Sequence, residues 1–205
     1  MTKRIGIYLG GLSLTALGIA LIISSSVGAG PWDTVAVGLT KHLGLTIGTW
    51  SIFSQVMFIL ITWILEKSRF RIESVIPIFI RSVFVDFWYY IVLGNVELTS
   101  SWELQIASFL TGIILAGIGI GIYMEVNFPK TPIDGMMVAI SNRFGWSFNV
   151  VRMGIECTGT FLGFVLGGPV GLGTLVIALF LGKIIQIVNT RMKRIMQVSD
   201  ATQSF

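Results

Sequence analysis

Two ionisable side chains, Arg152 and Glu156, stand four residues apart inside an apolar stretch of the sequence. If the stretch is helical, both lie on one helix face, where they can pair with each other or bind a charged solute. Ionisable groups inside apolar spans are energetically costly and are therefore candidates for function. The alternative is a structural ion pair beside a helix-packing seam, because Gly159 and Gly163 continue roughly the same stripe.

Two further carboxylates belong to a motif that occurs twice. Residues 31–44 and 132–145 align without a gap at an offset of 101 residues, which matches Pro with Pro, Asp33 with Asp134 and Gly with Gly. A carboxylate in the first turn stabilises a helix by about 0.3–1 kcal/mol at exposed sites. Because it stands in both copies, each Asp is also a candidate for binding a cationic group or exchanging protons. Trp32 is either a ring that stacks on a solute or a residue of the membrane-interface belt.

Two polar residues in other apolar stretches complete the set of candidates. Gln55 occupies in the first copy the position that Glu156 occupies in the second, so a polar stripe persists there without the charge. Asp86 follows Arg81 by five residues, about 140° round a helix, so each needs a partner on another helix or water. The candidate substrate-binding residues are Trp32, Asp33, Gln55, Asp86, Asp134, Arg152 and Glu156.

The sequence favours no catalytic or metal centre. It contains one histidine, His42, and one cysteine, Cys157, and it has no Walker A pattern and no Gly-x-Ser-x-Gly motif. One histidine cannot build a metal site alone, and one cysteine cannot build a disulfide framework. We therefore expect no enzyme, no metal and no cofactor.

The composition indicates a protein that crosses a membrane several times. Hydrophobic residues make up 54% of the chain and charged residues 12%, and the mean hydropathy is +0.85. A soluble domain carries about 25% charged residues. The net charge of +4 calls for no nucleic-acid partner, because the positions of the cations on one side of the membrane explain it.

The apolar stretches predict six spanning helices and two short ones. The expected spans are about 5–26, 46–65, 72–93, 104–124, 148–166 and 174–188. The short helices, about 31–43 and 132–144, each start with proline and stop before glycine, and about three turns are too few to cross a bilayer. Whether they re-enter the bilayer or lie at its surface stays open.

The lysines and arginines predict the orientation. With a cytoplasmic N-terminus, Lys41 falls outside, and the residues on the cytoplasmic side are Lys3, Arg4, Lys67, Arg69, Arg71, Lys130, Arg143, Arg191, Lys193 and Arg194. Both termini are then cytoplasmic, as six spans require.

The duplicated motif predicts two repeats of opposite orientation. Residues 1–97 and 98–205 would each hold three spans, with a short broken or re-entrant helix after the first span. Since three is odd, the second repeat enters the membrane inverted, which is the plan of many secondary transporters. The expected fold class is an all-α membrane protein with one integral membrane domain.

Three segments carry a resemblance to a known family: residues 28–33 (Gly-Ala-Gly-Pro-Trp-Asp), 131–135 (Thr-Pro-Ile-Asp-Gly) and 171–174 (Gly-Leu-Gly-Thr). The chain resembles the YczE/YyaS/YitT-type bacterial integral membrane proteins, and the YczE branch most of all. The resemblance implies a multispan protein of the bacterial plasma membrane and implies no particular substrate.

We expect secondary transport or export of a small cationic or zwitterionic solute, with proton coupling as an option, because both short helices bring their own carboxylate. The first alternative is a substrate-capture subunit of an energy-coupling-factor importer, in which Ala16 and Ala20 would dock a partner helix. The second is a membrane accessory protein that transports nothing. The expected partners are the lipid bilayer, the solute and a second copy of the chain.

Overall fold

The computed structural model of the protein describes residues 2–66, 75–126 and 132–202. Every regular element in these ranges is helical, as expected. The elements are α1 (Thr2–Ser24), α2 (Pro31–Leu43), α3 (Ile47–Glu66), α4 (Val75–Asp86), a π-helical segment η2 (Phe87–Val92), α5 (Trp102–Tyr123), a 3-10 segment η3 (Met124–Val126), α6 (Pro132–Phe144), α7 (Phe148–Val165) and α8 (Leu172–Thr202).

The two short helices, α2 and α6, begin and end where the sequence predicts. Gly30 is the N-cap of α2 and Pro31 its first residue, and Gly44 after its end has a φ of 72°. Gly145 follows α6 with a φ of 70°. Both glycines occupy the left-handed region, which ends a helix without the steric penalty of a Cβ. The expected cap Thr131 lies outside the described residues.

The expectation of six apolar spans is confirmed only in part. In the described ranges, five helical stretches are long and apolar enough to cross a membrane: Arg4–Ser24, Ile47–Glu66, Val75–Val92, Trp102–Val126 and Leu172–Arg194. The remaining expected span forms the 18-residue helix α7, which contains Arg152 and Glu156 and is not one of the five. The last helix, α8, continues past the expected end at residue 188.

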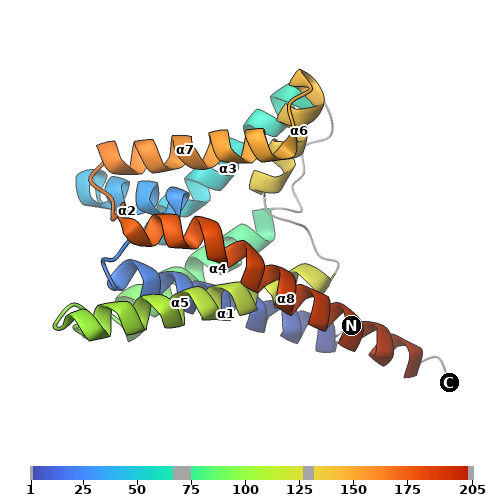
Figure 1. The fold of residues 1–205 in the computed structure, drawn as a ribbon, viewed down its shortest axis with the longest axis horizontal. Coiled ribbons are helices and arrows are strands. Elements are labelled where there is room, and N and C mark those ends of the chain that lie inside the picture. Colours follow the sequence, from blue (N-terminus) through green and yellow to red (C-terminus); the bar gives the residue numbers. More distant parts are fainter. Residues whose placement is uncertain (1, 67–74, 127–131, 203–205) are drawn as a thin grey trace.

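The long helices run between two ends of the molecule (Figure 1). Both chain termini lie at one end, and the turn from α7 to α8 lies at the other. α1 packs along α5, α2 packs along α7, and α3 packs along α6. α4 covers α1, and α8 covers α5. α1 and α5 therefore form one packed pair with α4 and α8 against it, and α2, α3, α6 and α7 pack mainly on one another.

Small residues allow α1 and α5 to approach closely. A Cβ on Gly18 would lie 2.6 Å from the carbonyl oxygen of Gly112, so a larger residue does not fit there. Ala16 and Ala20 on α1 are fully buried inside the chain. This alanine pair offers no free surface to a partner helix, so the docking role expected for it in the importer-subunit alternative has no basis in this structure.

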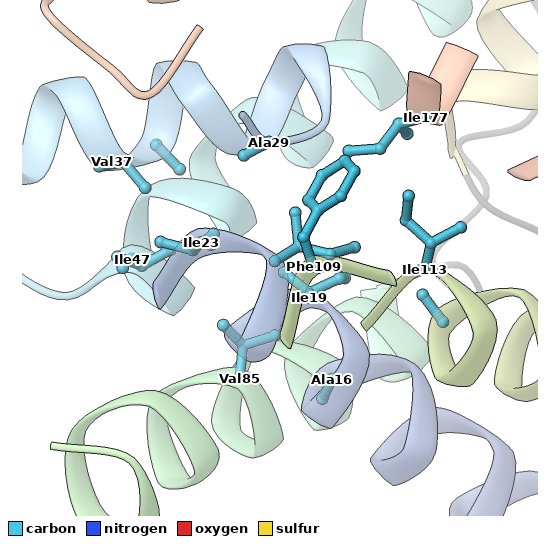
Figure 2. Packing of buried hydrophobic residues seen from close by; sticks show 13 residues of the cluster. Ala16, Ile19, Ile23, Ala29, Val37, Ile47, Val85, Phe109, Ile113 and Ile177 are labelled. Atoms are coloured by element: carbon cyan, nitrogen blue, oxygen red, sulfur yellow. The ribbon is translucent and has the colours of Figure 1, made fainter. Parts of the chain in front are cut away.

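Hydrophobic side chains from several helices meet beside this seam (Figure 2). Ile19 and Ile23 of α1 lie next to Phe109 of α5, and Ile177 of α8 approaches the same ring. Val37 of α2 belongs to the same cluster, so the short helix is held by the core rather than lying on the surface.

Candidate functional site

The short helix α2 starts inside the bundle and ends at one end of it. Its Trp32 faces Gly159 in α7, where a Cβ would lie 2.9 Å from the indole Nε1. Further along, a Cβ on Gly38 would lie 2.6 Å from the Cβ of Leu166, just after the end of α7. Lys41 donates a hydrogen bond of 2.7 Å to the Gly167 carbonyl. The two helices therefore run in the same direction, and the α2 N-terminus lies beside the interior of α7.

The second short helix, α6, starts at a comparable depth beside α3. Its first residue, Pro132, lines a pocket together with Gln55, the ninth residue of α3. Met136 packs into one hydrophobic cluster with Phe58 of α3. Because the Trp32 ring meets Phe58 edge-on, with ring centroids 4.6 Å apart, the N-terminal turns of α2 and α6 converge on the middle of α3.

A pocket lies where the first turn of α6 meets α3 and α4, and we call it the central pocket. Its lining residues are Leu12, Gln55, Pro77, Ile78, Arg81, Tyr123 and Pro132. The space has room for about one water molecule. The side chain of Gln55 is 8% exposed, and its Oε1 atom has no hydrogen-bond partner. A buried acceptor without a partner is energetically costly unless a solute or water supplies a donor.

An acidic side chain, Asp33, and a basic one, Arg81, influence each other electrostatically near this junction. Burial raises the pKa of the Asp33 carboxyl, which belongs to the short helix α2, and the nearby Arg81 guanidinium partly offsets that rise. The carboxylate folds back over Gly30, where a Cβ would lie 2.6 Å from Asp33 Oδ2. Glycine at this N-cap therefore leaves room for the charge.

Arg81 was missing from the candidate residues that the sequence suggested. The signal for it was present, because a charge inside an apolar span requires a partner on another element. The structure shows an electrostatic influence of Arg81 on Asp33, a residue 48 positions earlier in the chain.

Trp32 lies inside a packed cluster rather than at an end of the molecule. Its ring packs with Phe58, Met136 and Ile155. The indole Nε1 is buried against Gly159 and has no hydrogen-bond partner. Its surroundings differ from those of a membrane-belt residue, whose polar edge reaches water.

Arg152 and Glu156 lie apart from the central pocket. Together with Ile133, Met137 and Ile155 they line a second small pocket between α6 and α7, where Arg152 is exposed and Glu156 is half-buried. Asp134 is the third residue of α6, and its side chain lies outside the described part of the chain.

Asp86 is the last residue of α4, and its side chain lies beside the start of α3. Its Oδ1 accepts a hydrogen bond of 2.7 Å from the backbone N–H of Gly48, and the Tyr90 hydroxyl accepts one of 3.3 Å from Ile47. These are two of the N–H groups that a helix start leaves without an intrahelical partner. Asp86 therefore acts as a cap that joins α4 to α3 and does not line the central pocket.

Comparison with known proteins gives the family. Residues 2–190 match the family described as "Family of unknown function (DUF6198)". The "Uncharacterized membrane protein YczE" of Bacillus subtilis is 32% identical over 180 residues, which is 87% of this chain and 82% of that protein. The "Uncharacterized protein YyaS" of the same organism is 30% identical over 177 residues, 86% of this chain and 88% of that protein.

An "Uncharacterized protein" of Haemophilus influenzae is 34% identical over 184 residues, which is 90% of this chain and 82% of that protein. No solved structure matches the chain. The resemblance seen in residues 28–33, 131–135 and 171–174 is thereby confirmed. With five apolar helices in the described ranges and relatives that include YczE and YyaS, the chain is a membrane protein that belongs to the DUF6198 family.

Proposed function

We propose that the protein is a secondary transporter or exporter of a small cationic or zwitterionic solute, and that the central pocket is its solute site. The observation that carries the proposal is the convergence of the α2 and α6 N-terminal turns inside the bundle, beside Gln55. Broken helices that meet near the midplane form the solute sites of many secondary transporters, where their termini contribute partial charges.

The packing of the helices supports two inverted repeats, residues 1–97 and 98–205. Exchange of the repeats turns α2 into α6 and α3 into α7, so the contact of α2 with α7 becomes that of α6 with α3. The contact of α1 with α4 likewise becomes that of α5 with α8. All four of these contacts are present. The exchange leaves the contact between α1 and α5 unchanged, because each helix takes the place of the other.

The same relation supports six crossings with both termini in the cytoplasm of a bacterial cell. The 18 residues of α7 span about 27 Å, which is close to the thickness of the hydrocarbon core. Both termini lie at one end in Figure 1. The excess of lysine and arginine on the N-terminal side assigns that end to the inner face of the plasma membrane.

One departure from symmetry fits alternating access. α3 packs against α4 and is joined to it by the Asp86–Gly48 hydrogen bond, whereas α7 makes no comparable packing with α8 in the described residues. A transporter built from inverted repeats opens to one side when its two halves adopt different arrangements.

Proton coupling has a candidate group in Asp33. Its buried carboxyl is stabilised in the protonated form, so it can bind and release a proton as the pocket opens to each side. Removing this carboxylate together with Asp134 tests the whole proposal, because asparagine caps a helix as well as aspartate does.

The test uses proteoliposomes of the wild type and of the double variant Asp33→Asn with Asp134→Asn. Solute-driven currents and internal pH are recorded for a panel of amines, amino acids, quaternary ammonium compounds and anions. The matched control is Glu103→Gln, an exposed carboxylate in the first turn of α5. We expect the wild type and the control to move at least one cationic or zwitterionic solute and the double variant to lose that flux.

Equal flux in the double variant, or wild-type flux limited to anions, would overturn the proposal. A wild-type protein that moves no member of the panel and copurifies with an ATPase would support the importer-subunit alternative instead.

A further inference from the structure

We infer that the central pocket binds a compact zwitterion, whose carboxylate contacts Arg81 and whose ammonium group donates a hydrogen bond to Gln55 Oε1. The inference rests on the proposed function, because it names the solute class of the same site. It also narrows that proposal, since it excludes simple cations as the preferred solute.

The anionic end of the solute is assigned by Arg81. This half-buried guanidinium lines the pocket opposite the first turn of α6. Helix N-terminal turns carry about half a unit of positive charge, so both features favour a negative group in the same place. A guanidinium also offers paired N–H donors that match the two oxygens of a carboxylate.

The cationic end is assigned by acceptors. Gln55 Oε1 is a buried acceptor without a donor, and an ammonium group can supply one. Charges act strongly on one another in a site shielded from water, so the Arg81 guanidinium repels the ammonium group, which binds at Gln55 instead.

The pocket selects against solutes that lack either group. An amine without a carboxylate would bring a second positive charge beside Arg81, and an acid without an amine would leave Gln55 Oε1 without a donor. Leu12, Pro77 and Ile78 close the remaining wall with apolar surface. The space now admits about one water molecule, so the solute is short and its entry requires α4 and α6 to separate.

The experiment compares molecules that share a skeleton and differ only in charge. Thermal unfolding of the purified wild type in detergent is measured with β-alanine, propylamine and propionate, and then with 4-aminobutyrate, butylamine and butyrate. We expect a saturable rise in melting temperature with at least one amino acid, and no comparable rise with the matching amine or acid.

Variants of the pocket identify the contact. Arg81→Gln should weaken binding of the amino acid by about tenfold or more, as expected for the loss of a charged hydrogen bond. Arg81→Lys should retain part of the affinity. Arg143→Gln, which removes an exposed arginine near the end of α6, is the control and should bind as the wild type does. If Arg81→Gln alone is unstable, its combination with Asp33→Asn removes both charges and should also lose binding.

Three results would overturn the inference. One is an amine that stabilises the protein as well as the amino acid does and still stabilises Arg81→Gln. Another is an acid that behaves in this way. The third is the absence of any rise with either amino acid. The first result leaves the transport proposal standing with a cation as solute, because the flux measurement with Asp33 and Asp134 decides that proposal separately.

Discussion

Asp33 and Asp86 are both carboxylates close to the start of a helix, but their surroundings differ. Asp86 Oδ1 accepts a hydrogen bond of 2.7 Å from Gly48, so it satisfies a free N–H of α3. Asp33 lies over its own N-cap, Gly30, and shares its environment with Arg81. The hydrogen bond of Asp86 stabilises the fold, whereas Asp33 is a buried carboxyl that can bind and release a proton inside the bundle.

The cap formed by Asp86 predicts a stability change. Asp86→Ala should lower the free energy of unfolding by about 1–3 kcal/mol, because Gly48 loses its charged acceptor. In a protein of this size that corresponds to a fall in melting temperature of about 2–4 °C per kcal/mol. Asp86→Asn should lose less, since its amide oxygen can still accept. The control Glu97→Ala, in an exposed loop, should unfold like the wild type. Equal melting of all four proteins would refute the cap.

The environment of Asp33 predicts that the stability of the protein depends on pH. Its pKa is raised in the folded protein, so its favourable contribution to stability is complete at low pH and is lost as the pH rises through the raised pKa. Asp33→Asn removes this titration. The melting temperature of the variant relative to the wild type should therefore increase as the pH rises above about 4, the ordinary pKa of an aspartate. A difference that stays constant over this range would show that the carboxyl titrates normally.

At the scale of elements, local signals in the sequence were sufficient for the short helices. Proline at the first position and glycine after the last residue set the bounds of α2 and α6, and these signals act within a few residues. The end of α8 was missed, because polar residues after 188 can continue a helix once it has left the membrane.

The composition of the central pocket could not be predicted in the same way. Gln55 was found through the repeat, but Arg81 joins it only because α4 packs against α3, which is a matter of tertiary packing. Leu12 and Tyr123 carry no signal in the sequence, since apolar and aromatic residues are common in every span. No feature of the sequence predicted the π-helical segment after Asp86 either.

Close packing of α2 on α7 depends on glycine, which a matched pair of variants can test. A Cβ on Gly163 would lie 2.7 Å from the Thr34 Cβ, whereas a Cβ on Gly154 meets nothing within 4 Å. Gly163→Ala should destabilise the protein by about 1–3 kcal/mol through overpacking. Gly154→Ala, on the same helix, should be neutral or up to about 1 kcal/mol more stable. Equal effects of the two alanines on thermal unfolding would refute the contact.

At the scale of the whole molecule, the number of crossings depends on α7. In the described ranges five helical stretches are long and apolar enough to cross a membrane, and α7, which carries Arg152 and Glu156, is not one of them. If α7 crosses, the two termini share a side of the membrane. If α7 does not cross, Leu172 lies on the cytoplasmic side and the end of α8 lies outside the cell. The polarity of one helix therefore decides the orientation of the last 30 residues or so.

Cysteine labelling in whole cells distinguishes these topologies. The background is Cys157→Ser, because the native cysteine is exposed. The probe before α8 is Leu172→Cys, because Leu172 is 78% exposed. Gly168 is unsuitable, because a Cβ there would collide with the Thr34 carbonyl. With six crossings, an impermeant thiol reagent should label Leu172→Cys and should not label Trp146→Cys or Lys193→Cys until the cells are opened.

With five crossings, Lys193→Cys would label from outside and Leu172→Cys would not. Asn95→Cys, before α5, serves as the external reference in both cases, since it precedes α7. Labelling of Lys193→Cys in intact cells would therefore remove the inverted relation between the repeats, because a second repeat with two crossings cannot mirror a first repeat with three. The contacts of α2 with α7 and of α6 with α3 would then need another origin, and the convergence of the two short helices on Gln55 would lose its functional meaning.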